Sequence, residues 1–291
     1  MFLSLLPEGN SGIASKYPGD RGIGHDSAVV FADDFSSGAP KADTLFGDVK
    51  ITRDADRVRT AGACALELVL PRDWPGRHVI AGFHHHIPEP LDCLFLRYYA
   101  KYDGDVELYH GGTHNGGTIA ARAPGVPDAK PGIPADGVNE FTALLDTWRP
   151  DDSVRSPGPL AVYCYHPEQR HRWGEHFFAS GRMLPPGTSG AEYFGSGFVP
   201  RPDIIPERGR WYCYELMVKA NTPGQRDGRI AFWVDGKLAG DFPNMRLRDV
   251  DALKITRFTL EIYTGNPKVL GPAIMWYSDV VVAKSYVGPT C

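Results

Sequence analysis

Histidine side chains are the first candidates for proton transfer in this chain. His110 and His114 flank the tripeptide Gly-Gly-Thr within the segment YHGGTHNGG. A neutral imidazole can accept or donate a proton at physiological pH. The neighbouring glycines would let a bound molecule approach the backbone closely. We therefore predict that this segment is a catalytic loop, with His110 and His114 as candidate bases.

A second group of basic and aromatic residues follows the apolar run VYCY. It comprises Tyr165, His166, Arg170, His171, Arg172, Trp173, His176 and Arg182. Their spacing matches no metal-binding motif. The group predicts a binding or catalytic loop, with Arg172, Trp173 and His176 as candidate substrate contacts. The alternative is a solvated loop, because charged runs are commonly exposed faces.

Two segments have polar residues at every second position, the period of a β-strand. In 95–102 the alternation places Arg97, Tyr99 and Lys101 on one face. In 257–263 the residues that share a face are Arg257, Thr259, Glu261 and Tyr263. Each stripe is either part of a site or the wet outer face that antiparallel sheets normally carry.

The elements that must position these residues are short strands. The chain has 291 residues with 33 glycines and 25 prolines, which favours many turns over long helices. We predict one all-β domain over 1–291, a sandwich of two antiparallel sheets, with an irregular N-terminal arm at 1–27 and long irregular segments at 111–139 and 167–210. The predicted strands are 28–35, 47–52, 64–70, 78–85, 94–102, 106–110, 140–147, 160–166, 211–220, 229–239, 254–264 and 274–286.

Composition excludes several classes of protein. The net charge of −4 disfavours nucleic acid as a partner, since a phosphate-binding surface normally has a basic excess. No apolar run approaches the length of about 18 residues that would span a membrane. The five cysteines follow no zinc-binding pattern, and we expect no organic cofactor.

The two ends of the chain predict a structural calcium site. Strands at 28–35 and 274–286 would pair in one sheet and bring together Asp33, Asp34 and Asp279. Carboxylates and backbone carbonyls are the ligands that Ca²⁺ prefers. We expect Asp34 and Asp279 to be the metal ligands. The alternative is that these are ordinary carboxylates at strand ends.

The block from Gly209 to Phe242 contains two strands, a polar turn and a tight hairpin. A W-x-x-x-E strand begins at Trp211, NTPGQRDG supplies turn chemistry, and Asp235-Gly236 within WVDGK predicts a type I′ turn. The block resembles polysaccharide lyases of the concanavalin-like jelly-roll type, in particular the family-fourteen-like alginate and glucuronan lyases. No predicted strand carries the R-x-E-x-R or Q-x-H motif of another jelly-roll lyase family.

The resemblance implies a jelly-roll fold and β-elimination on a uronic-acid polymer. That reaction needs a neutraliser for the substrate carboxylate, a base near C5 and a proton donor at the glycosidic oxygen. The candidate neutralisers are Arg97, Lys101 and Asn115; the candidate bases are His110, His114 and His166; the candidate acids are Tyr99 and Tyr165. Glu261 and Tyr263 are further candidate substrate contacts.

Two other functions remain open on the same fold. A glycoside hydrolase would need two carboxyl groups about 5 to 10 Å apart, and the candidates are Glu175, Glu215 and Glu261. A noncatalytic sugar-binding module would use an aromatic platform made of Trp173, Trp211, Tyr165 and Tyr263. An enzyme acting on a polymer is expected to be secreted or periplasmic, although no signal peptide is visible at the N-terminus.

Overall fold

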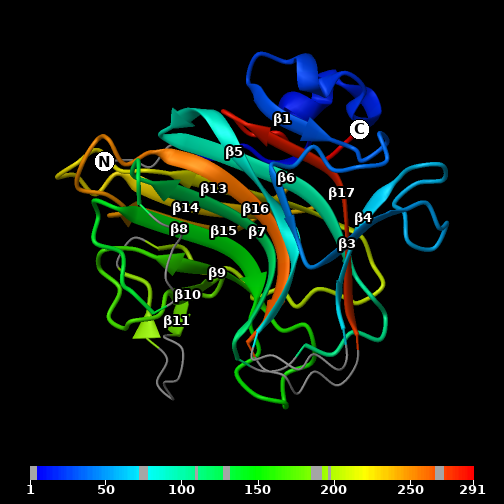
Figure 1. The fold of residues 1–291 in the computed structure, drawn as a ribbon. Helices are drawn as coiled ribbons and strands as arrows, with labels where there is room; N and C mark the ends of the chain where they lie inside the picture. Colours follow the sequence, from blue (N-terminus) through cyan, green and yellow to red (C-terminus); the bar gives the residue numbers. More distant parts are fainter. Residues whose placement is uncertain are drawn as a thin grey trace.

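The computed structural model describes residues 5–71, 78–108, 111–126, 132–184, 192–195, 198–265 and 272–291. Two antiparallel sheets pack against each other through one large hydrophobic core (Figure 1). The predicted all-β sandwich is therefore confirmed. Within the described residues, no helix has the length and apolar character needed to cross a membrane.

The first sheet, called here the outer sheet, has eight strands. Its order is β15-β14-β13-β6-β17-β4-β3, and β1 pairs with β17 beside this path. The strands are β1 (Val29–Asp33), β3 (Asp48–Thr52), β4 (Ala65–Leu70), β6 (Cys93–Tyr102), β13 (Tyr212–Lys219), β14 (Gly228–Val234), β15 (Lys237–Met245) and β17 (Ala273–Ala283). The predicted pairing of the two terminal strands is confirmed, since Ala32 lies opposite Val281.

The second sheet, called here the cleft sheet, has nine strands. Its order is β12-β11-β10-β9-β8-β7-β16-β5-β2. The strands are β2 (Thr44–Phe46), β5 (Val79–Leu91), β7 (Thr113–Arg122), β8 (Glu140–Thr147), β9 (Leu160–Tyr165), β10 (Glu175–Phe178), β11 (Arg182–Leu184), β12 (Glu192–Tyr193) and β16 (Ile255–Thr264). In Figure 1 the long strands β5, β16, β7 and β8 curve together across the molecule.

The N-terminal arm packs on the outer sheet beside the C-terminus. It contains four short 3₁₀ turns, η1 (Gly9–Ser11), η2 (Ile13–Lys16), η3 (Pro18–Asp20) and η4 (Ile23–His25). Ile13 and Ala14 donate backbone hydrogen bonds to the carbonyls of Tyr286 and Val287 at 3.1 and 2.9 Å. Glu215 of β13 accepts the backbone N–H groups of Val287 and Gly288 at 2.7 and 2.9 Å. Both chain ends therefore cover the outer sheet.

The two predicted irregular segments are partly wrong. The first contains β7, which lies in the middle of the cleft sheet, and the second contains β10, β11 and β12. The glycine-rich sequence of β7 has weak strand propensity, and its hydrogen bonds to β16 and β8 on both sides hold it in the sheet. The predicted strand at 106–110 is also wrong over 106–108, which have no regular structure, and 109–110 lie outside the described residues.

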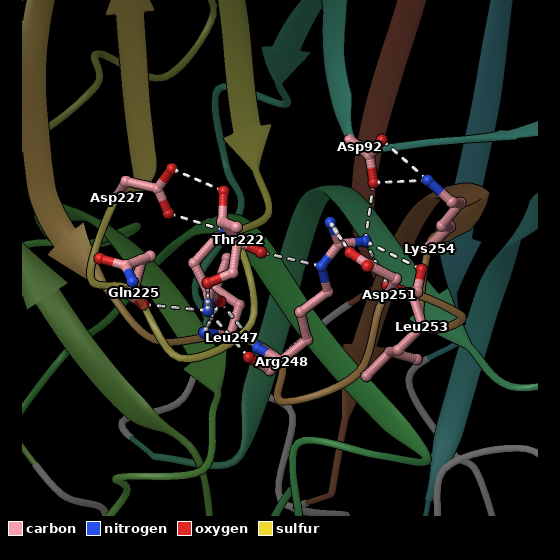
Figure 2. Close-up of polar contacts among 10 residues, drawn as sticks. Asp92, Thr222, Gln225, Asp227, Leu247, Arg248, Asp251, Leu253 and Lys254 are labelled. Atoms are coloured by element: carbon pink, nitrogen blue, oxygen red, sulfur yellow. Dashed lines mark hydrogen bonds and ion pairs between the residues drawn. The ribbon is translucent and has the colours of Figure 1, made fainter.

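The NTPG turn joins three loop segments at one end of the sandwich. The fully buried Asn221 accepts the N–H groups of Leu247 and Arg248 at 2.7 and 2.8 Å. The Arg248 guanidinium in turn donates to Asp92 Oδ1 and to the Leu253 carbonyl at 2.7 and 2.9 Å (Figure 2). Positive φ angles at Asp235 and Gly236, 50° and 76°, fit the predicted type I′ turn. The motifs that carry the resemblance therefore have structural roles.

Candidate active site

A cleft of about 800 Å³ lies on the face of the cleft sheet that points away from the core. Strands β5, β7, β8, β9, β10 and β16 all contribute side chains to it. On β16 these are the members of the polar stripe at positions 257, 259, 261 and 263. The stripe predicted from its alternation therefore lines the cleft.

His114 of β7 is held in a fixed orientation within this cleft. Its Nδ1 lies 2.9 Å from Oδ2 of Asp146, whose side chain has no exposed surface. Its ring is stacked between Tyr163 and Tyr263, with centroid distances of 4.7 and 5.5 Å. About a fifth of the His114 side chain is exposed, at 20%. A carboxylate at Nδ1 favours the tautomer that leaves Nε2 as a proton acceptor.

Asp146 is an unusually basic carboxyl group. Burial raises its pKa to about 6, against the lowering effect of the hydrogen bond and charge of His114. The nearby carboxyl of Glu261 raises it further. In its ionised form Asp146 accepts the proton on Nδ1 of His114 with the stronger, charge-assisted hydrogen bond.

Tyr163 and Tyr165 of β9 form a pair of hydrogen-bonded hydroxyl groups next to His114. The Tyr163 hydroxyl donates to Tyr165 Oη at 3.3 Å and accepts the N–H of Gly174 at 3.1 Å. Burial raises the pKa of Tyr163. Because Tyr165 Oη accepts from Tyr163, its own proton is available for donation into the cleft.

Aromatic and basic side chains complete the walls. His176 is fully buried between Trp148 and Tyr163, at centroid distances of 4.1 and 4.6 Å. Trp173 also lines the cleft, and the Arg172 guanidinium lies 4.8 Å from its ring centroid. Two arginines, Arg122 of β7 and Arg257 of β16, line the cleft as well. Polar, aromatic and cationic groups together suit a sugar chain with acidic substituents.

The side chain of Tyr263 is held in place by a hydrogen bond to His78, which precedes β5. Its hydroxyl lies 2.8 Å from Nδ1 of His78, a residue just before β5. Burial, and to a lesser extent the charge of Glu261, raises the pKa of Tyr263. This contact holds the Tyr263 ring against His114.

Three predicted catalytic residues, Arg97, Tyr99 and Lys101, lie on the wrong sheet. They belong to β6, on the outer face that the chain ends cover. Arg97 is fully buried and donates to Asp20 at 2.5 Å and to the Asp279 carbonyl at 2.7 Å. Tyr99 accepts the N–H of Thr290, and Lys101 donates to the carbonyl of Asp56. The prediction that these residues share a site with His114 is wrong.

Asn115 and His166 also point away from the cleft. Asn115 follows His114 on β7 and so faces the core, where its Oδ1 accepts the hydroxyls of Tyr102 and Thr147. His166 is buried at the end of β9, with Nε2 2.9 Å from Glu175. Neither lines the cleft, so their placement does not support the predicted neutralising role of Asn115 or the predicted basic role of His166. His110 lies outside the described residues.

The predicted calcium ligands have other partners. The Asp279 carboxylate accepts from Arg59 Nε at 2.8 Å, and Asp34 accepts the N–H of Ser36 at 3.0 Å. No group of three or more candidate ligand side chains occurs in the part of the chain described. Guanidinium groups of Arg59 and Arg97 surround Asp279, so this donor set does not fit a shared cation at Asp34 and Asp279.

Sequence reasoning missed Asp146, Tyr163, Trp148, His78 and Arg122. Tyr163 could have been found, because it has the same alternation phase as Tyr165 in VYCY. Asp146 could not be linked to His114 while residues 111–139 were expected to be irregular. The contact depends on the register that places β7 beside β8.

Comparisons with known proteins support the fold. No protein-family model matches the chain, and no curated protein matches it. The solved structure of alginate lyase Aly36B is 17% identical, with a TM-score of 0.57 over 89% of this chain and 98% of that one. The PL-14 alginate lyase from Aplysia kurodai is 12% identical, with a TM-score of 0.58 over 89% and 100%. The endo-β-1,4-glucuronan lyase from Trichoderma reesei is 13% identical, with a TM-score of 0.52 over 88% and 96%. The fold of this chain is similar to that of jelly-roll polysaccharide lyases.

Proposed function

We propose that this protein is a polysaccharide lyase that cleaves a uronic-acid-containing polymer by β-elimination. The observation that carries the proposal is the His114–Asp146 pair beside the Tyr163–Tyr165 hydroxyl pair in a cleft that also contains arginines. Elimination requires a base and an acid that can both reach the same sugar unit in an open cleft. Similar solved structures include Aly36B variants with bound alginate oligosaccharides, which supports an acidic polysaccharide as substrate.

His114 would act as the base and Tyr165 as the acid. Nε2 of His114 takes the proton from C5 of a uronate unit, and the resulting charge spreads onto the adjacent carboxylate. The C4–O4 bond then breaks, the C4=C5 double bond forms, and Tyr165 gives its hydroxyl proton to O4. Asp146 fixes the imidazole and stabilises the imidazolium, the role that a buried carboxylate has beside other catalytic histidines.

The carboxyl groups of the cleft are poorly arranged for hydrolysis. Of the three candidates, Glu215 faces the C-terminal segment and Glu175 is bonded to His166 and Arg170. Only Glu261 lines the cleft, and the nearby Asp146 is bonded to His114. A hydrolase needs one carboxyl as acid and a second as nucleophile or base, so the arrangement favours elimination. Trp211 packs against the outer sheet with Trp276, which removes it from a sugar platform in the cleft.

The test is incubation with alginate, β-1,4-glucuronan and a neutral β-glucan. Ultraviolet absorbance of unsaturated uronate ends and the release of reducing ends are recorded separately. We expect both signals to rise together on an acidic polymer and neither on the neutral one. Reducing ends without new absorbance would make the protein a hydrolase, and binding without cleavage would make it a sugar-binding module. An enzyme with such a substrate would act outside the cytoplasm, so we also propose that it is secreted or periplasmic.

A further inference from the structure

Glu261 lines the cleft floor, and the residues opposite it on both neighbouring strands are glycines. On β16 it lies opposite Gly82 of β5 and Gly116 of β7. The next pair along the ladder is Tyr263 with His114. Two residues of a strand span about 7 Å, so the Glu261 carboxyl is within one sugar ring of the proposed base.

The surroundings of Glu261 favour its neutral form. Its carboxyl makes no hydrogen bond or ion pair with any described residue; the only bond recorded for Glu261 is to its backbone carbonyl, from Tyr277. The titratable and charged groups that face it are His114 of β7, Asp146 of β8, Arg257 and Tyr263 of β16, and His84 of β5. Burial raises the pKa of Glu261, while the charges of His114 and Arg257 oppose that rise. Ionising a buried carboxyl group that has no hydrogen-bond donor is unfavourable in free energy, so Glu261 retains its proton more readily than an exposed glutamate.

The arginines of the cleft occupy strand positions remote from His114. Arg257 is six residues from Tyr263 on β16, which corresponds to about 20 Å along the strand. Arg122 is eight residues from His114 on β7, or about 26 Å. Arg122 would therefore hold a carboxylate several sugar units away, whereas the charge of Arg257 still acts on Glu261. Among the described residues that line the cleft, no lysine or arginine lies next to His114.

We propose that Glu261 in its protonated form donates a hydrogen bond to the carboxylate of the uronate unit from which His114 takes the proton. This role rests on the proposed lyase function. As the C5–H bond breaks, its electron pair moves into the carboxylate, and the Glu261 O–H hydrogen bond stabilises the added negative charge. When the C4–O4 bond breaks, the electron pair forms the C4=C5 double bond. Glu261 keeps its proton overall, His114 has gained one, and Tyr165 has lost one to O4.

The experiment compares wild type, Glu261→Gln, Glu261→Ala and the control Glu89→Gln. Glu89 lies on β5, and 78% of its side chain is exposed. The control therefore makes the same change of carboxylate to amide at a position outside the cleft. The readout is the pH profile of kcat/KM on alginate or β-1,4-glucuronan, whichever the wild type cleaves. In Glu261→Gln the amide can still donate, so we expect a loss within about 10-fold and an alkaline limb moved to higher pH. Glu261→Ala should lose about 100-fold or more, as for removal of an oxyanion donor.

A second measurement separates this role from the lyase function itself. Binding of an oligosaccharide of the cleaved polymer to His114→Ala is followed by calorimetry at pH 8 in buffers of different ionisation enthalpy. We expect proton uptake on binding, absent when Glu261→Gln is added. Unsaturated products with no proton uptake and an unchanged alkaline limb would overturn the role of Glu261 alone. Loss of 100-fold or more in Glu261→Gln would show that the carboxylate acts as an anion. Absence of unsaturated products from the wild type would overturn both proposals.

Discussion

Replacing Asp146 by asparagine removes the negative charge next to Nδ1 of His114 but keeps a side chain of the same shape there. The amide keeps the shape of the side chain, but its oxygen and nitrogen no longer specify the tautomer with a free Nε2. In the serine-protease triad the equivalent change lowers kcat by about 10⁴-fold. We expect Asp146→Asn to lower kcat by about 10³-fold or more, with KM changed little.

The same substitution should not weaken the fold at neutral pH. The pKa of Asp146 is raised from an ordinary 3.8 to about 6. A raised pKa means that the folded state binds the proton more tightly, so this group favours folding below about pH 4 and loses that contribution as pH rises to about 6. The difference corresponds to about 3 kcal/mol, at about 1.4 kcal/mol per pH unit. In Asp146→Asn the free energy of unfolding should no longer decrease by this amount as pH rises from about 4 to about 6.

The assays are initial rates from unsaturated-product absorbance and urea unfolding at pH 4.5 and 7.5. Asp152→Asn serves as the control, because Asp152 follows β8 and its side chain is 72% exposed. We expect the control to change neither quantity beyond about 0.5 kcal/mol or twofold. Full activity of Asp146→Asn would refute the His114–Asp146 base, and unfolding of the variant at pH 7.5 would refute the electrostatic argument.

Four further changes test other parts of the structure. Tyr165→Phe should lower kcat by about 100-fold with an unchanged melting temperature, and wild-type activity would remove Tyr165 as the acid. Arg97→Ala should destabilise the fold by about 3 kcal/mol, because it leaves Asp20 without its partner, while activity per folded molecule stays unchanged; a catalytic loss at full stability would contradict the placement. Asn221→Ala should cost about 3 kcal/mol, since buried N–H groups lose their acceptor, as urea titration will measure. Excess chelator should leave the melting temperature unchanged, and a clear decrease would restore the calcium site.

The fold was largely predictable because its strands have strong local signals. β13, β14 and β15 combine aromatic and β-branched residues with turn chemistry at Asn221 and Asp235, and β17 is a long apolar run. Alternation alone also placed Glu261 and Tyr263 on a common polar face. These features depend on neighbours in sequence, which is why they needed no tertiary information.

The choice between the two polar stripes depended on tertiary structure. The stripes of β6 and β16 have the same period and similar residue types, yet one lies under the chain ends and the other lines the cleft. Arg97 is buried because the arm brings Asp20 to it across 77 positions of sequence. No local pattern in 95–102 specifies that contact.

The glycines of β7 show why the site was harder to predict than the fold. They suggested close approach of a substrate, but their neighbours within the protein already require them. A Cβ at Gly117 would lie 2.6 Å from Tyr98 on the core side, and one at Gly116 would lie 2.0 Å from the Leu145 carbonyl. Packing against the outer sheet and β8 therefore excludes side chains at both positions. The same two glycines weaken the strand signal around His114, so the residues that the packing of β7 requires also hide this strand of the cleft sheet from sequence analysis.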